Sequence, residues 1–187
     1  MRIVGGELRG RPLAAPRSDA IRPTTDRTRE SLFNILSHRY PEALCGTRVL
    51  DLFSGTGALG IEALSRGASF CLFIEESVEG RALLRDNIEA LGLQGRTKVF
   101  RRDATRLGDA GTIAPFDLVM ADPPYGRGLG EAAFASAIQG GWVKPGAILV
   151  LEEEAEAMPA LDPRLEVIDE RRFGGTFIRL LCFSNKP

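Results

Sequence analysis

Cysteine, histidine and lysine are scarce in this sequence of 187 residues. The three cysteines, Cys45, Cys71 and Cys182, are far apart and form no Cys-x-x-Cys pair. Because His38 is the only histidine, we expect neither a zinc site nor a disulfide framework, and no other metal. The cysteines are interpreted instead as small hydrophobic residues in or near the core.

Long apolar runs are also lacking. No run approaches the roughly 20 residues that span a bilayer, and the first residues lack the apolar stretch of a secretory signal. The content of 44% hydrophobic and 26% charged residues is typical of a folded soluble protein, and the length suits one domain with a small appendage. We therefore expect a cytoplasmic protein without membrane contact, acting as a monomer.

The positive charge is unevenly distributed along the chain. Arginine supplies all but three of the 24 basic residues, and residues 1–40 hold eight arginines against four acidic residues. This end carries +4, whereas the whole chain carries −1. The planar guanidinium suits phosphates and base edges. A high genomic GC content also favours arginine, so the clustering is more informative than the number.

The pattern of apolar residues predicts an α/β fold. Residues 2–13 are expected to form a hairpin, and a helix capped by Thr24 or Thr25 should run to about Arg39. From residue 47 strands and helices alternate, which is typical of parallel βαβ units. The expected strands are 48–52, 70–75, 97–101, 116–121, 146–151, 164–171 and 176–183, and the expected helices are 57–66, 78–91 and 130–141.

These elements predict a doubly wound, mostly parallel, Rossmann-like sheet. The last two strands should form a C-terminal antiparallel hairpin, and residues 1–40 a small N-terminal extension of hairpin and helix. Residues 41–187 would then be the main domain. Ligands of such sheets bind at the carboxyl ends of the strands, near the point where the strand order reverses.

A glycine-rich turn, DLFSGTGALG at 51–60, follows the first expected strand and precedes a helix. Gly55 and Gly57 allow close approach of the backbone to a ligand. The spacing Gly55-x-Gly57-x-x-Gly60 also fits a dinucleotide fingerprint, with Glu75 as the ribose acceptor. The same segment can also be interpreted as a turn that needs positive φ and binds no ligand.

Asp51 favours S-adenosylmethionine over a dinucleotide. A carboxylate just before the turn would repel a pyrophosphate, but it can accept hydrogen bonds from a cationic ammonium group. Glu75, at the end of the second strand, is placed to accept both ribose hydroxyls. Asp103 and Ala104 follow the third strand, where they could hold an adenine ring, although a residue like Asp103 is more often a helix N-cap.

The segment Asp122-Pro123-Pro124-Tyr125 follows a buried strand. Its prolines fix φ and donate no N–H, which leaves a stiff loop of hydrogen-bond acceptors. The Asp122 carboxylate and the Pro123 carbonyl could each accept one N–H of an exocyclic amine, so that the nitrogen attacks a sulfonium methyl. Tyr125 offers a face on which a flipped base can stack. The loop therefore predicts methylation of a nucleobase amine.

The two segments together resemble the amino-methyltransferase group, which modifies adenine N6, cytosine N4 or guanine N2 through an Asp/Asn-Pro-Pro-aromatic loop. The N-terminal segment narrows this resemblance to the RsmD family of bacterial 16S rRNA guanine-N2 methyltransferases, and the likeness covers nearly the whole chain. It rests on MRIVGG at 1–6, RGR at 9–11, RPTTDRTRESLFNIL at 22–36 and FGGT at 173–176.

This resemblance implies methylation of one guanine in 16S rRNA, within an assembling 30S subunit, with S-adenosylmethionine as the methyl donor. It implies that Asp122, Pro123, Pro124 and Tyr125 are catalytic. The implied cofactor contacts are Asp51, Phe53, Ser54, Gly55, Thr56, Gly57, Glu75, Asp103 and Ala104. The implied RNA contacts are Arg9, Arg11, Arg17, Arg22, Arg27 and Arg29, and the acidic run 152–154 should face away from RNA.

Three other functions remain open at this stage. A DNA or RNA adenine N6-methyltransferase would share the catalytic loop, but a DNA enzyme typically needs a recognition domain for which little chain is left. A nicotinamide-dependent oxidoreductase fits the glycine spacing but lacks an evident proton donor, because His38 is interpreted as a helix surface residue. A noncatalytic RNA-binding module would leave the loop at Asp122 unexplained.

Overall fold

The computed structural model describes residues 1–16 and 25–185, and within them a seven-stranded sheet forms the centre of the protein. The strand order is β3-β2-β1-β4-β5-β7-β6, with β1 to β5 parallel and β7 antiparallel to both of its neighbours. The expected Rossmann-like α/β fold with a C-terminal antiparallel hairpin is confirmed. The strands are β1 (Arg48–Asp51), β2 (Phe70–Ile74), β3 (Thr97–Phe100), β4 (Phe116–Ala121), β5 (Val143–Glu154), β6 (Leu165–Phe173) and β7 (Thr176–Phe183).

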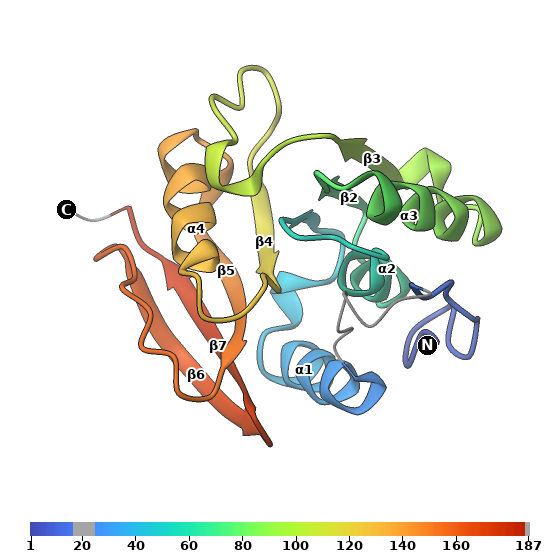
Figure 1. The fold of residues 1–187 in the computed structure, drawn as a ribbon, viewed down its shortest axis with the longest axis horizontal. Helices are drawn as coiled ribbons and strands as arrows, with labels where there is room; N and C mark the ends of the chain where they lie inside the picture. Colours follow the sequence, from blue (N-terminus) through green and yellow to red (C-terminus); the bar gives the residue numbers. More distant parts are fainter. Residues whose placement is uncertain (17–24, 186–187) are drawn as a thin grey trace.

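Helices cover both faces of this sheet (Figure 1). Side chains of α1, α2 and α3 pack on one face, and those of α4 pack on the other with the short helix η3. Successive residues of β1 and β4 alternate between these two cores, so the central strands are apolar on both faces, as parallel strands usually are. The helices are α1 (Asp26–Arg39), α2 (Ala58–Ser65), α3 (Val78–Ala90) and α4 (Leu129–Gln139), with 3-10 turns η1 (Pro41–Ala43), η2 (Gln94–Arg96) and η3 (Ala104–Arg106).

The strand order reverses between β1 and β4. The chain passes outward from β1 through β2 to β3 and then returns to place β4 on the other side of β1. The carboxyl ends of β1 and β4 therefore meet at the switch point, where ligands of doubly wound sheets bind. The glycine-rich turn follows β1 and the Asp-Pro-Pro-Tyr loop follows β4, so the fold brings the two sequence motifs side by side.

The N-terminal segment folds back on itself, but the expected hairpin is reduced to one bridge between Arg2 and Pro12. Backbone bonds from the amides of Ile3, Gly10 and Leu13 still cross this segment, but the amides of Val4 and Glu7 turn to α2. Val4 donates to the Glu62 carboxylate at 3.0 Å and Glu7 donates to the Ser65 carbonyl at 2.8 Å. Ile3 and Leu13 enter the core beside α1 and α2.

Helix α1 begins one residue after its cap. The Thr25 hydroxyl accepts a hydrogen bond from the amide of Thr28 at 3.1 Å, so Thr25 is the cap in the structure, and Thr24 lies outside the described residues. The single histidine, His38, lies exposed on this helix as expected. In the described part of the chain, no helix has the length and apolar character needed to cross a membrane.

Two local expectations differ from the structure. Strand β5 extends to Glu154, three residues beyond the expected end, because residues 152–154 pair with β7. Cys45 is exposed in the turn before β1, whereas Cys71 is buried and Cys182 partly buried. The interpretation of the cysteines as core residues was therefore wrong for Cys45, whose turn places it outside both apolar clusters.

Candidate active site

Four acidic residues lie at the carboxyl ends of four neighbouring strands. Asp51 ends β1, and Glu75, Asp103 and Asp122 follow the ends of β2, β3 and β4. Because the strand order is β3-β2-β1-β4, the carboxylates form a row from Asp103 through Glu75 and Asp51 to Asp122. Such an edge favours cationic groups and hydroxyl donors and disfavours a diphosphate.

The glycine-rich turn depends on its glycines for conformation and for packing. Gly57, the N-cap of α2, has φ of 82°, in the left-handed region that glycine adopts without strain. A Cβ on Gly60 would lie 2.4 Å from the Phe73 ring and 2.6 Å from the Cys71 sulfur. The third glycine of the motif therefore lets α2 pack closely on β2.

Asp51 is buried at the base of this turn, with 1% of its surface exposed. Its Oδ2 accepts a hydrogen bond from the amide of Gly60 at 3.0 Å, whereas Oδ1 has no hydrogen-bond partner within the described residues. Burial raises the pKa of Asp51 to about 7, against the opposing effect of the Gly60 amide. A buried carboxylate oxygen of this kind fits a ligand that brings a positively charged donor.

Glu75 joins the turn after β1 to the end of β2. One carboxylate oxygen accepts from the amide of Gly55 at 2.7 Å, and the other accepts from the amide of Ser77 at 2.8 Å. In a dinucleotide-binding turn, amides of this segment face the pyrophosphate. Since Glu75 occupies the Gly55 amide, this arrangement argues against a dinucleotide.

The other residues expected around the cofactor lie in the same region. Ser54 is buried, and its hydroxyl bonds the carbonyls of Asp51 at 2.8 Å and Ile74 at 3.1 Å, so it joins the two strand ends. Phe53 is partly buried against the apolar core on the face of the sheet that α4 covers. Asp103 is the N-cap of η3: Thr105 donates through its hydroxyl and amide, which holds the pKa of Asp103 below its usual value. Ala104 is buried beside it.

The Asp-Pro-Pro-Tyr loop begins beside Asp51. Asp51 pairs with Met120 across β1 and β4, so Asp122 lies two positions further along the same edge. Asp122 is partly exposed, Pro123 is buried and Pro124 is exposed. The phenol of Tyr125 lies 3.1 Å from a carboxylate oxygen of Glu152 and 2.9 Å from the hydroxyl of Thr176.

Sequence reasoning missed three residues that support this site. Glu152 and Thr176 hold Tyr125 from β5 and β7. The buried Asn87 of α3 donates to the carbonyl of Thr56 at 2.9 Å and accepts from the amide of Ala14 at 2.7 Å, which ties the N-terminal segment to the glycine-rich turn. The position of residues 152–154 at the carboxyl end of β5, next to β4, was the available signal for Glu152.

Six arginines were expected to contact RNA. Of these, Arg9, Arg11 and Arg27 are exposed. Arg17 and Arg22 lie outside the described residues.

Arg29 requires a correction. It is completely buried, and its guanidinium pairs with Asp26 at 2.8 Å and Glu62 at 3.7 Å and donates to the carbonyl of Arg2. The helix face that carries Arg29 turns toward α2, so this arginine joins the N-terminal segment to the main sheet and has no surface to offer a phosphate.

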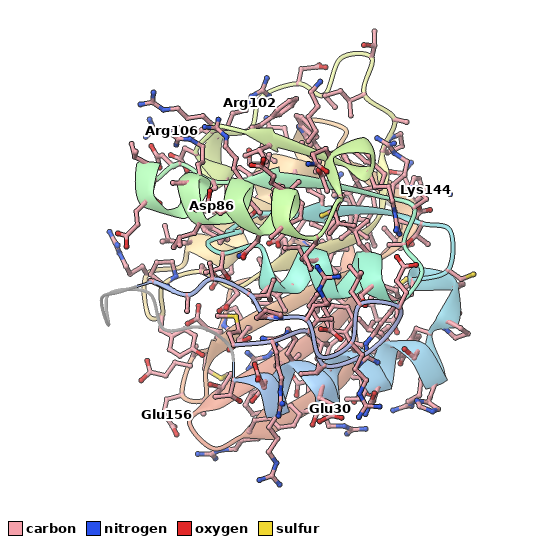
Figure 2. The ribbon with its side chains drawn as sticks, turned by 90° about the vertical axis from the view of Figure 1, so that its right-hand side faces the viewer. Glu30, Asp86, Arg102, Arg106, Lys144 and Glu156 are labelled. Atoms are coloured by element: carbon pink, nitrogen blue, oxygen red, sulfur yellow. The ribbon has the colours of Figure 1, made fainter. Side chains whose placement is uncertain are left out.

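Further exposed arginines lie just beyond the end of β3. Arg101, Arg102 and Arg106 follow β3 on either side of Asp103. Figure 2 shows Arg102 and Arg106 at one end of the molecule, opposite Glu30 and Glu156. The guanidinium of Arg102 lies over the rings of Phe100 and Trp142 and donates to the Leu107 carbonyl, so it is fixed in place. Across residues 1–16 and 25–185, no cluster of three or more His, Cys, Asp or Glu side chains is suited to a metal ion.

Comparison with known protein families places almost the entire chain. Residues 1–182 match the model of the family described as Conserved hypothetical protein 95. The chain is 38% identical over 182 residues to ribosomal RNA small subunit methyltransferase D of Escherichia coli K12, covering 96% of this chain and 88% of that protein. It is 34% identical over 165 residues to the Haemophilus influenzae protein of the same name, covering 87% and 83% of the two chains.

Solved structures agree with this relationship. An E. coli protein named as a methyltransferase, yhhF, superposes with a TM-score of 0.85 at 33% identity and covers 100% of this chain and 99% of its own. A hypothetical protein of Thermus thermophilus superposes with a TM-score of 0.75 at 30% identity, covering 96% and 98%. The chain therefore belongs to the Conserved hypothetical protein 95 family, as a methyltransferase of the ribosomal RNA small subunit methyltransferase D type.

Proposed function

We propose that this enzyme transfers a methyl group from S-adenosylmethionine to the exocyclic N2 amine of a guanine in 16S rRNA, within an assembling small ribosomal subunit. The observation that carries the proposal is that the glycine-rich turn and the Asp-Pro-Pro-Tyr loop lie side by side at the switch point of the sheet. The buried Asp51 of the turn suits a cationic cofactor, and the acceptors of the loop suit an amine. The choice of guanine and of 16S rRNA follows from the resemblance to the family.

Residues at the carboxyl ends of β1, β2 and β3 would hold the cofactor. Asp51, whose buried Oδ1 has no partner among the described residues, suits the ammonium of the methionine part. Glu75 suits the ribose hydroxyls, because a carboxylate oxygen that already accepts one amide can accept a further hydrogen bond. Asp103 and Ala104 lie where the adenine would be held. The cofactor would supply an electrophilic methyl on a sulfonium. The rest of the cofactor leaves as a neutral thioether, so no acid is needed to protonate the leaving group.

Asp122 and the backbone of Pro123 would orient the target amine. An aromatic amine is a poor nucleophile because its lone pair is delocalised into the ring. Hydrogen bonds from its two N–H groups to the Asp122 carboxylate and the Pro123 carbonyl favour a pyramidal nitrogen with its lone pair available. Asp122 then attracts the proton that the amine loses, and such participation contributes about 10²- to 10⁴-fold to the rate. Stacking of the base on Tyr125 completes the alignment.

The exposed arginines of the N-terminal segment would contact RNA phosphates. Arg9 and Arg11 lie on the segment whose residue Ala14 is bonded to Asn87, and the same Asn87 bonds the glycine-rich turn. RNA bound by this segment would therefore lie near the cofactor. Arg27 is exposed close to it at the start of α1, and Arg17 and Arg22 belong to the same stretch of sequence.

The test is methyl transfer to small-subunit particles that lack the modification. Purified protein with labelled S-adenosylmethionine should label the 16S rRNA of these particles, and mass spectrometry of the digested RNA should identify N2-methylguanosine. Detection of N6-methyladenosine instead would show that the target base is adenine and not guanine. Calorimetry that detects binding of NAD and none of S-adenosylmethionine would overturn it altogether.

A further inference from the structure

The hydroxyl of Tyr125 is bonded by two side chains from strands that carry neither sequence motif. Glu152 lies near the end of β5 with 5% of its surface exposed, and its Oε1 is 3.1 Å from the phenol oxygen. Thr176 begins β7, and its hydroxyl lies 2.9 Å from the same oxygen. These contacts span 27 and 51 positions of sequence, so they depend on the pairing of β5 with β7.

The chemistry of the three groups fixes the direction of both hydrogen bonds. A carboxylate can only accept, so the single phenol proton points to Glu152. The phenol oxygen is then left to accept from the Thr176 hydroxyl. Burial raises the pKa of Tyr125 well above its usual value, and the negative charges of Glu152 and Asp122 act in the same direction. The phenol therefore keeps its proton, and the chain runs from Thr176 through Tyr125 to Glu152.

A second contact secures the next residue of the loop to the same strand. The amide of Gly126 donates to Oε1 of Glu153 at 3.2 Å, and that oxygen also accepts from the amide of Glu154 at 3.0 Å. Glu153 is 1% exposed. Two adjacent buried carboxylates of β5 thus hold two adjacent residues of the loop, one through a side chain and one through the backbone. Burying a carboxylate costs free energy unless it accepts hydrogen bonds, so the bonds from the loop help to offset the burial of both side chains.

We propose that Glu152 and Thr176 are positioning residues of the methyl transfer, which act by fixing the ring plane of Tyr125 against the target base. This inference rests on the proposed function. Rotation about Cα–Cβ would carry the hydroxyl away from its two partners. Rotation about Cβ–Cγ leaves the oxygen in place, but the phenol O–H prefers the plane of the ring, so the two partners also favour one ring plane. Since the ring lies three residues from Asp122, its plane sets where a stacked base places its amine. Alignment of this kind acts on the rate of transfer more than on affinity for the particle.

The first experiment compares kcat and KM for small-subunit particles. Thr176→Val keeps the shape of the side chain but removes the hydroxyl, and we expect kcat to fall about three- to tenfold with KM for particle and cofactor unchanged. Thr176→Ser should restore kcat. The matched control is Thr97→Val on β3, which removes a hydroxyl bonded to the Leu93 carbonyl far from the loop. Full kcat in Thr176→Val, or a change only in KM, would overturn the proposal.

A double-mutant cycle separates positioning from general stabilisation of the fold. Tyr125→Phe keeps the stacking face but removes the phenol, so Thr176 then has nothing to hold. In that background Thr176→Val should cause no further loss of kcat. A loss that simply adds to that of Tyr125→Phe contradicts a role through Tyr125.

An independent readout uses NMR of protein labelled at the tyrosine Cζ. The chain contains two tyrosines, so Tyr40→Phe assigns the Tyr125 resonance. This resonance should move in Thr176→Val and in Glu152→Gln and stay in place in Thr97→Val. An unchanged resonance in both variants refutes the hydrogen-bond chain even if transfer is never observed. If the wild-type protein fails to methylate particles while the resonance moves as expected, the proposed function fails and the contacts stand.

Discussion

The proposed cofactor half of the site, with Asp51, Glu75 and Asp103, and the proposed target half, with Asp122 and Tyr125, are built differently. In the first, Asp51, Glu75 and Asp103 accept backbone amides of Gly60, Ser77 and Thr105, each within nine residues in sequence. In the second, Tyr125 is held by Glu152 and Thr176, which lie 27 and 51 positions away. Apart from the bond between Gly55 and Glu75, which spans 20 positions, these contacts of the first half are local in sequence, whereas those of the second depend on correct pairing of strands further apart.

The largest effect we expect comes from Asp122→Ala in the target half. Loss of the acceptor for the amine should lower kcat about 10²- to 10⁴-fold. Cofactor affinity should stay within about twofold, because Asp122 lies outside the three strand ends that form the cofactor half. Transfer assays and calorimetry measure the two quantities. Asp122→Asn retains an amide oxygen as acceptor and should recover part of the rate; equal activity of Asp122→Ala and wild type contradicts the role.

Asp51→Asn tests the cofactor half. Loss of the charge facing the ammonium should weaken S-adenosylmethionine binding about 10- to 100-fold by calorimetry. The exposed Asp86 on α3 provides a matched control, Asp86→Asn, which should bind normally. If the Asp51→Asn protein also alters the Tyr125 NMR resonance, the two halves are coupled and the comparison fails.

The pH dependence of stability follows from the same carboxyl. Burial raises the pKa of Asp51 from 3.8 to about 7. The folded protein therefore holds a proton that the unfolded chain releases, and the stability of the ligand-free protein falls as pH rises from 3.8 to about 7. Asp51→Asn removes this loss, so its melting temperature at about pH 8 should exceed that of wild type by several degrees. A lower melting temperature of the variant at that pH would show that the carboxylate is stabilised when charged.

The smallest effect concerns the N-terminal arginines, which lie outside both halves. Replacing Arg9 and Arg11 with glutamine should weaken RNA binding a few-fold and reduce the salt slope of affinity by about one per phosphate contact. Arg164→Gln at the far edge of the sheet serves as the charge-matched control for each substitution. Affinity and slope that do not change would remove both arginines from the RNA surface.

The comparison also explains what the sequence could and could not predict. The glycine-rich turn and the Asp-Pro-Pro-Tyr loop are contiguous, so their places at the ends of β1 and β4 follow from the alternation of strands and helices. Asp103 as an N-cap is equally local. The partners of Tyr125 required the register of β5 and β7, in which Glu154 pairs with Thr176, and nothing local encodes that register.

The sequence also could not show which arginines are buried. Arg29 was assigned to RNA because it lies in a basic stretch, but it faces Glu62 of α2. The sequence holds Arg27 and Arg29 two positions apart on a helix, where they point to different sides. Only the packing of α1 on α2 decides which of them is buried, and that packing follows from apolar contacts of Leu32, Phe33 and Leu36.

The consecutive prolines of the Asp-Pro-Pro-Tyr loop have an entropic consequence. Pro123 and Pro124 restrict the backbone of the unfolded chain as well as that of the folded one, so less conformational freedom is lost when the loop folds. The loop is then already ordered before any base arrives, with Pro123 buried and its neighbour exposed. Binding of the target nucleotide need not order this segment of the enzyme, and the ordering cost of recognition falls mainly on the RNA.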